Sequence, residues 1–300
     1  MYHRVALLPG YTYPIAVSPE RFRQHMAHLK QHYQPLPLGE LADALGGGSI
    51  PRRAVAITFD DGYADNYLNA LPILSDLGVP ATVFVSSGYI DDDREYWWDD
   101  LERILLSSHT VPRRLELAIQ GQRYSWASDS TERRRSLRKE LHRVIKPLVP
   151  EEREQILDVL ANWAGRGRSA RPEHRSLTRD ELRHLASNPL VEIGGHTVDH
   201  PQLAAIPLEK QYREISEGRD ELERIIGKRI KTFSYPYGGS GDFTAETTDL
   251  VRQAGFMAAC STRAALATTA SDLFRLPRYW VGDWGIDQFQ KEISGFFEHR

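Results

Sequence analysis

Two adjacent carboxylates, Asp60 and Asp61, directly follow the apolar run Ala56–Phe59 and precede the turn residue Gly62. An apolar run of this kind predicts a buried strand, so the two charges would lie at its C-terminal end. Burying carboxylates is costly unless they bind a metal ion or a cation, and a pair at a strand end therefore suggests a site. The alternative is a surface turn, because Asp-Gly is also a common hairpin signal.

A second short strand pattern, Leu190–Gly195, is followed by His196 and His200. If the chain turns helically there, residues four apart project on one face, and both imidazoles can bind one metal ion. The spacing is that of the zinc-protease helix, but Thr197 stands where that motif requires its glutamate base, which argues against a metalloprotease. The three ligands Asp61, His196 and His200 would leave coordination positions open for water and substrate, as in catalytic metal sites.

Three segments resemble, in chain order, the first three motifs of the polysaccharide deacetylases, also called the NodB-homology or carbohydrate esterase family 4 domain. These segments are Thr58–Gly62, His196–His200 and Tyr235–Gly238. The resemblance extends over most of residues 1–282. It implies that Asp60 is the general base and that Asp61 binds the metal together with the two motif histidines. It also implies a distorted, incomplete (β/α) barrel with its site at the C-terminal strand ends.

Short apolar strands alternate with amphipathic helices, which independently predicts a parallel α/β fold. The predicted strands are residues 5–8, a strand ending at residue 59, residues 81–85, a strand ending at residue 194, and residues 230–233, 256–260 and 276–281. Thr178 and Glu181 form a predicted capping box at the start of a helix. Seven or so such units would make a barrel, and with the family resemblance we expect a single domain over residues 1–300, a distorted (β/α)7 TIM-like barrel.

Residues 91–175 interrupt this alternation and predict a mostly helical insertion. The basic run Arg133–Arg135 could attract an anionic glycan or a membrane surface, but a solvated helix face is the simpler explanation. Trp98, within the aromatic run Tyr96–Trp98, is a candidate substrate contact because aromatic rings stack on the apolar faces of sugars. Its alternative role is to anchor the insertion in a hydrophobic core.

Cleavage of an amide also requires a group that protonates the leaving nitrogen. In the common arrangement of the family, a histidine from a late strand does this, but no histidine occurs between His200 and His299. His3, within Met1–Val5, resembles instead the last motif of a permuted branch in which that motif has moved to the N-terminus. A closed barrel permits this because its first and last strands are neighbours. The alternative is a frayed terminal histidine.

The third motif departs from the family pattern because Ser234 stands where most relatives have an arginine that pairs with the general base. Arg278 is our candidate for the missing cation, with a surface arginine as the alternative. Tyr237 and its neighbour Pro236 are expected to line the substrate cleft. The backbone amide of Tyr237 could also stabilise an oxyanion.

Composition agrees with an enzyme of this size. The chain has 300 residues, of which 41% are hydrophobic and 26% are charged, with a net charge of −3, and nothing in this balance indicates a nucleic-acid partner. The single cysteine, Cys260, excludes an internal disulfide framework and is expected to pack in a strand. No segment predicts a transmembrane span, and the start at Met1 lacks an apolar signal, so we expect a cytoplasmic location; a shortened chain would look the same.

The sequence thus predicts a metal-dependent N-deacetylase that acts on an N-acetylated sugar in a polysaccharide, an oligosaccharide or a glycan precursor. Zinc is the expected metal because two histidines and one aspartate suit it, and cobalt, nickel or manganese would fit the same ligands. Two alternatives stay open: a hydrolase of another acyl group or a non-sugar amide, and an inactive glycan-binding module. The sequence identifies neither the glycan nor the oligomeric state.

Overall fold

The computed structural model describes residues 1–107, 110–168 and 170–298 and contains two compact units. The first unit comprises Met1–Asp92 and Ser176–Arg300, and the second comprises Asp93–Arg175. The second unit lies within the region predicted as an insertion, residues 91–175.

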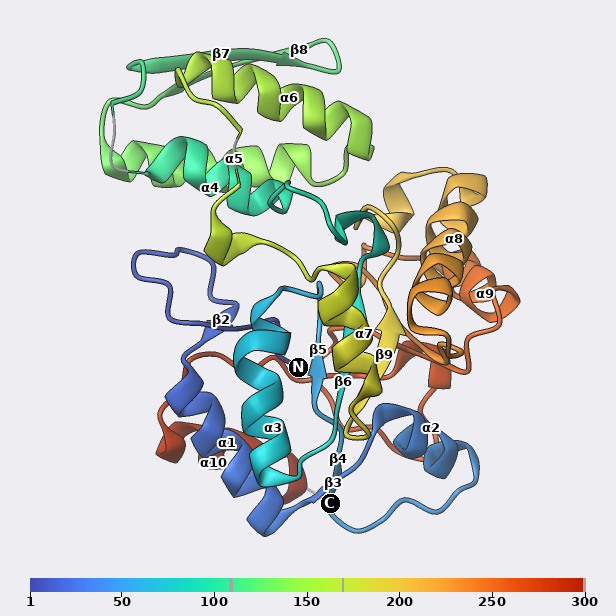
Figure 1. Cartoon of the computed structure of the whole chain (residues 1–300). Coiled ribbons are helices and arrows are strands. Elements are labelled where there is room, and N and C mark those ends of the chain that lie inside the picture. Colours follow the sequence, from blue (N-terminus) through green and yellow to red (C-terminus); the bar gives the residue numbers. More distant parts are fainter. Residues whose placement is uncertain (108–109, 169, 299–300) are drawn as a thin grey trace. The chain divides into compact units, whose positions relative to one another are not determined.

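A five-stranded parallel sheet with the order β11-β10-β9-β6-β5 forms the centre of the first unit (Figure 1). Its strands are β5 (Thr58–Phe59), β6 (Ala81–Val85), β9 (Val191–Gly195), β10 (Thr232–Ser234) and β11 (Ala258–Cys260). Nearly every residue in these strands is buried, as expected for a parallel sheet that is covered on both faces.

Two further segments close the sheet between β5 and β11. Tyr2 forms a parallel bridge with Phe59, and Leu276 forms one with β11. The two segments also bond to each other, because the amide of Val281 donates to the carbonyl of Met1 at 3.0 Å. The result is a curled parallel sheet whose two ends are joined, within the described residues, only by isolated bridges and single hydrogen bonds, consistent with the distorted (β/α) barrel that the sequence predicts.

The barrel is surrounded by helices whose ends carry clear sequence signals. They are α1 (Pro19–His32), α2 (Leu38–Gly46), α3 (Leu71–Leu77), α7 (Arg179–Ser187), α8 (Leu208–Ile226), α9 (Ala245–Gln253) and α10 (Ile286–Glu298). Pro19 occupies the first turn of α1, where its missing N–H costs no hydrogen bond. The predicted capping box of Thr178 and Glu181 is present at α7.

Short elements connect these helices and strands. They are β1 (Arg4–Val5), β2 (Ala16–Val17), β3 (Gln34–Pro35), β4 (Ala54–Val55), the π-helical turn η1 (Asn66–Ala70), and the 3₁₀ turns η2 (Ser87–Tyr89), η4 (Leu203–Ala205) and η5 (Leu273–Arg275). β1 pairs with β2, and β3 pairs with β4, both in parallel. Within the described ranges, no helix combines the length and apolar character needed to cross a membrane.

The second unit is mostly helical but also contains a hairpin that was not predicted from the sequence. Its elements are α4 (Trp97–Leu106), β7 (Arg114–Ile119), β8 (Gln122–Ala127), α5 (Thr131–Ile145), α6 (Pro150–Trp163) and η3 (Pro172–His174). β7 and β8 are antiparallel and meet at the two-residue turn Gln120-Gly121. Both turn residues have positive φ, at 46° and 79°, which suits the right-handed twist of a tight hairpin.

Candidate active site

The motif residues converge at one end of the barrel because they follow neighbouring strands. Asp60 and Asp61 follow β5, His196 follows β9, and Ser234 ends β10. All four side chains are at least 97% buried. Parallel strands end at the same edge of a sheet, so residues that are far apart in the sequence form one cluster there.

Asp61, His196 and His200 place their ligand atoms close together. The Oδ1 atom of Asp61 lies 3.5 Å from Nε2 of His196 and 3.3 Å from Nε2 of His200. Two ligands about 2.0–2.1 Å from a tetrahedral zinc ion would lie about 3.3 Å apart. The spacing of these three side chains therefore fits a single divalent ion.

The tautomer of His196 also fits a metal ligand. Its Nδ1 atom lies 2.7 Å from the carbonyl oxygen of Ser234, which can only accept a hydrogen bond, so Nδ1 carries the proton. Nε2, which faces Asp61, is then the ring atom that is available to bind a metal ion. A backbone carbonyl behind the ring is the usual partner of a metal-binding histidine.

The two histidines do not lie on a helix, and this part of the sequence prediction was wrong. Residues 196–200 form an irregular loop. Thr197 and His200 have positive φ, at 67° and 51°, so backbone bends rather than helical periodicity bring the two rings to one place. The rings lie 4.8 Å apart at 70°.

Backbone strain is concentrated in the motifs. Among the residues that the structure describes, seven non-glycine residues have positive φ, and four of them are Asp61, Thr197, His200 and Tyr237. Each such conformation costs of the order of 1–3 kcal/mol and persists only where the surroundings enforce it. The surrounding packing must therefore hold the site together.

Arg278 forms a two-pronged ion pair with Asp60. Its Nη1 and Nη2 atoms donate to Oδ1 and Oδ2 of Asp60, each at 2.7 Å. Nη2 also donates to the hydroxyl of Ser234 at 2.8 Å, and that hydroxyl lies 3.3 Å from Oδ2 of Asp60. The carboxylate of Asp60 is thus paired with a guanidinium from the segment that follows β11, as expected for Arg278.

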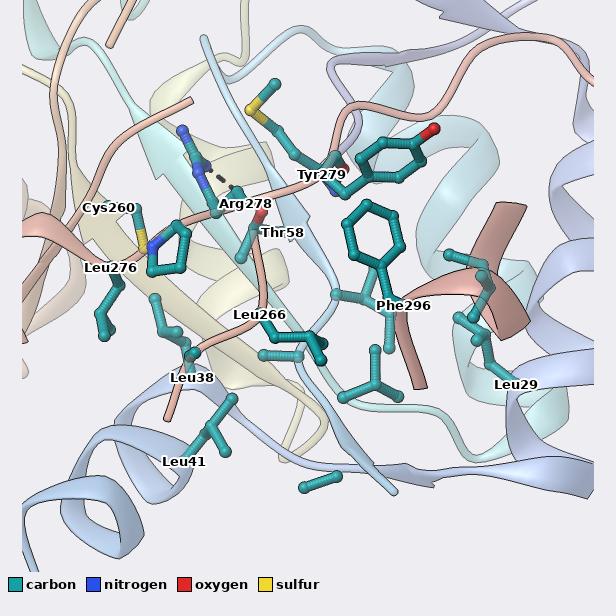
Figure 2. Close-up of a pocket in the computed structure, with 18 of the residues that line it drawn as sticks. Leu29, Leu38, Leu41, Thr58, Cys260, Leu266, Leu276, Arg278, Tyr279 and Phe296 are labelled. Carbon is teal, nitrogen blue, oxygen red and sulfur yellow. Dashed lines mark hydrogen bonds between the residues drawn. The ribbon is translucent and has the colours of Figure 1, made fainter. Parts of the chain in front are cut away.

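The environment of Arg278 strengthens this ion pair. Figure 2 shows Arg278 and Thr58, joined by a hydrogen bond, beside a cavity whose other labelled side chains are mostly apolar. The cavity has a volume of about 170 Å³ and includes Leu38, Leu276 and Phe296 in its lining. Arg278 and Asp60 are both at least 93% buried, so water screens their attraction only weakly.

Both aspartates are ionised in this site. Burial raises the pKa of Asp60, but Arg278 and then His196 lower it more, and the resulting pKa is about 2. Burial also raises the pKa of Asp61, whereas its contacts with His196 and His200 hold it well below the usual range. The ion pair with Arg278 fixes the orientation of Asp60 but also reduces its basicity.

His3 neighbours Asp60 in the barrel wall. Tyr2 and Phe59 are bridged, and their rings lie 5.7 Å apart on the same face of the wall. Side chains alternate along a strand, so His3 and Asp60 both project to the opposite face. Burial lowers the pKa of His3, while the charges of Asp61 and Asp60 raise it. The Nδ1 atom of His3 is buried and makes no hydrogen bond within the described residues.

Two residues that were not predicted from the sequence hold the strand next to His3. Asn66 donates to the carbonyl of His3 at 2.8 Å. Asp65 accepts hydrogen bonds from the side chain of Arg4 at 2.9 Å and from the amide of Val5 at 2.8 Å. Both residues lie just after the first motif. They are polar residues next to an otherwise apolar helix, and this could have marked them as hydrogen-bonding residues.

Three further residues, Tyr237, Pro236 and Trp98, were predicted to contact the substrate. Tyr237 is half-buried and packs edge-on against His200, with ring centres 4.7 Å apart. Pro236 is buried, and its carbonyl accepts a hydrogen bond from Gly238. Trp98 is buried in the second unit and stacks on Tyr96, as its core-packing alternative expects. Contact of these three residues with a substrate stays a prediction.

The chain matches the family described as polysaccharide deacetylase over residues 47–149 and 157–259. It is 21% identical over 269 residues to a putative polysaccharide deacetylase, YxkH, of Bacillus subtilis, and covers 66% of that protein. It is 29% identical over 119 residues to the poly-β-1,6-N-acetyl-D-glucosamine N-deacetylase of Escherichia coli, of which it covers 18%. The chain thus spans less than two thirds of the length of these relatives.

Solved structures with the same fold include two that align with this chain over nearly the whole length of both chains. A deacetylase of Streptococcus pyogenes, PplD, in complex with acetate aligns with a TM-score of 0.63 at 17% identity, over 97% of this chain and 94% of that one. IcaB from Ammonifex degensii aligns with a TM-score of 0.60 at 19% identity, over 98% of this chain and 93% of that one. At these identities the likeness establishes the fold.

Proposed function

This chain belongs to the polysaccharide deacetylase family, and from that premise we propose that it hydrolyses the N-acetyl group of an N-acetylated glycan with the help of a divalent metal ion. The observation that carries the proposal is the cluster of Asp61, His196 and His200 beside the Asp60–Arg278 ion pair. A metal ion held by the three ligands would polarise the acetamide carbonyl and lower the pKa of a water molecule.

Asp60 is the proposed general base. It is ionised at neutral pH, and Arg278 holds its carboxylate in one orientation. It takes a proton from the water that adds to the acetamide carbon. Because Arg278 provides a cation for Asp60, the serine in the third motif does not argue for an inactive glycan-binding module.

His3 is the proposed general acid. Its strand register with Asp60 supports this role, since both side chains project to the same face of the barrel wall. Protonated His3 donates to the nitrogen as the carbon–nitrogen bond breaks. The products are acetate and a free amino sugar, and the proton accepted by Asp60 balances the one that His3 supplies.

We propose poly-β-1,6-N-acetylglucosamine as the first substrate to test, because relatives from Escherichia coli and Staphylococcus aureus are named for that polymer. The Staphylococcus aureus relative is 22% identical over 287 residues, which is 94% of this chain and 73% of that protein. Zinc is the proposed metal, with cobalt, nickel and manganese as substitutes.

Acetate release tests this function. The zinc-loaded chain is incubated with poly-β-1,6-N-acetylglucosamine, β-1,4-linked N-acetylglucosamine oligomers, peptidoglycan fragments and a lipid-linked N-acetyl sugar, and Asp60→Asn serves as the inactive control. We expect acetate and new amines from at least one glycan with the wild type and far less with the variant. No acetate from any of these substrates, with zinc bound, would contradict the proposal.

A further inference from the structure

The loop that carries the two motif histidines is held from one side by the segment after β6. Three of its carbonyl groups accept hydrogen bonds from that segment. They are His196 from the Ser86 hydroxyl at 2.9 Å, Thr197 from the Ser87 amide at 3.1 Å, and Val198 from the Gly88 amide at 3.0 Å. This segment fixes the carbonyls of the loop, but the amides of Val198 and Asp199 must bond elsewhere.

One side chain from α8 accepts both of these amide hydrogens. The Oε2 atom of Glu214 lies 2.9 Å from the amide nitrogen of Val198 and 2.9 Å from that of Asp199. Two successive N–H groups on one carboxylate oxygen form an anion-binding nest, and bonds to a charged acceptor are stronger than bonds to a neutral one.

α8 lies unusually close to the loop at this point. Gly218, one turn after Glu214, faces the backbone of Thr197, and a Cβ atom at Gly218 would lie 2.9 Å from the carbonyl carbon and oxygen of Thr197. Real Cβ atoms do not approach that closely, so glycine is required for this contact. Glu214 and Gly218 therefore contact the loop from α8, in addition to the bonds that Ser86–Gly88 make to its carbonyls.

We propose that Glu214 is a positioning residue that sets the metal affinity of the site by holding the histidine loop in its bent conformation. Thr197 and His200 have the left-handed φ values that require such support. Without the carboxylate, the Val198 and Asp199 amides lose their acceptor, and the His196 and His200 rings no longer point together toward Asp61. The inference rests on the proposed metal site.

Zinc affinity, measured by competition with a chromophoric chelator, tests the proposal. Outer contacts of this kind typically change metal affinity 10- to 100-fold, and we expect Glu214→Ala to weaken zinc binding by that factor. Glu217→Ala is the matched control, because Glu217 lies on the same helix but is exposed. Its zinc affinity should equal that of the wild type.

Two further variants keep the test decisive if Glu214→Ala folds poorly. Glu214→Gln retains one acceptor oxygen without the charge, so its zinc affinity should fall between those of the wild type and Glu214→Ala. Gly218→Ala should also weaken zinc binding, although alanine favours a helix. When zinc is saturating, the kcat of each variant should be reduced by a smaller factor than its zinc affinity.

The outcomes separate this inference from the proposed function. If Glu214→Ala and Glu214→Gln bind zinc as tightly as the wild type, Glu214 has no positioning role, while the metal site itself stands. If the wild-type chain binds no divalent ion, the metal site is wrong, and the inference fails with it.

Discussion

Both units bury carboxylates, and Glu95 and Asp100 of the second unit have different partners from Asp61 of the first. In the second unit, Glu95 is bonded by two nitrogens of Arg171, at 3.0 and 2.7 Å. Asp100 accepts hydrogen bonds from Arg103 and, at 2.8 Å, from Arg168. These carboxylates are paired with guanidinium groups, which stay charged at every ordinary pH.

The barrel contains both a carboxylate that is paired with an arginine and a carboxylate that faces two histidines. Asp60 is bonded by Arg278, as Asp100 is by Arg103, and both arginines are nearly fully buried. Asp61, however, faces the imidazoles of His196 and His200. Neutral imidazoles leave lone pairs for a cation, whereas guanidinium groups have none.

Buried charge alone therefore does not identify a site. The arginine-paired carboxylates of the second unit have the contacts of a structural network, while the aspartate between two histidines has the contacts of a ligand set. Variants in both units can test whether this difference in partners corresponds to a difference in role.

The largest expected effect is on metal binding. Replacing both His196 and His200 with alanine should remove bound zinc and abolish deacetylation, because Asp61 alone cannot hold the ion. Metal content by elemental analysis and acetate release measure the two effects. Unfolding in the presence of a chelator should change little, and full zinc occupancy in the double variant would refute the ligand assignment.

Asp60→Asn should separate the base from the metal ligand. Loss of a general base typically lowers the rate by a factor of about 10²–10⁴, so we expect kcat to fall by at least about 10² while zinc stays bound. Asp61→Asn should instead weaken zinc binding. If Asp60→Asn loses zinc and Asp61→Asn keeps it, the two roles are reversed.

His3→Ala should lower kcat by at least about 10², as expected for a general acid, and leave zinc binding unchanged. In the wild type, kcat should fall on the alkaline side as His3 loses its proton, and the variant should lack that limb. Burial lowers the pKa of His3, so the limb should begin below the range of an exposed histidine. Near-normal turnover in the variant would show that another group is the acid.

Arg278→Met and Arg103→Met directly compare the two units. Removing one partner of a buried ion pair leaves an uncompensated charge and typically costs about 3–5 kcal/mol. Urea unfolding should therefore show a loss of similar size for both variants. Among the folded molecules, Arg278→Met should also lower kcat, whereas Arg103→Met should not. Equal kcat values for the two variants would contradict the proposed difference.

The smallest effect concerns the pH dependence of stability. Burial, and then Arg138 and Lys146, lower the pKa of His142 in the second unit to about 4, from an ordinary value of 6.5. Between pH 6.5 and pH 4, His142 is therefore protonated in the unfolded chain but not in the folded one. Proton binding thus favours the unfolded chain increasingly as the pH falls from 6.5 through 4. We expect the free energy of unfolding to decrease by roughly 1–3 kcal/mol over this interval.

His142→Phe is the control for this pH effect, because it keeps a ring against Trp97, whose centroid lies 4.7 Å from that of His142. The variant should lose less stability between pH 7 and pH 4 than the wild type. Parallel pH dependence of the two proteins in urea unfolding would show that His142 does not contribute.

Much of the barrel could be predicted because its signals are local. The apolar run before Asp60 and the strand at Ala81–Val85 occur where the sequence places them. The capping box of Thr178 and Glu181 depends on residues three apart, and its hydrogen bonds form within one helical turn. The β7–β8 hairpin was missed because its alternating residues lie among strong helical patterns.

The sequence by itself determined which groups the site contains: two aspartates after one strand and two histidines after another. Only the tertiary structure decided how they meet. Arg278 lies 218 positions from Asp60 and reaches it because the last barrel segment closes beside the first. The histidine loop bends through left-handed residues rather than a helix. Strand and cap signals depend on neighbours within a few residues, whereas these contacts depend on barrel closure and loop packing, which short-range patterns do not encode.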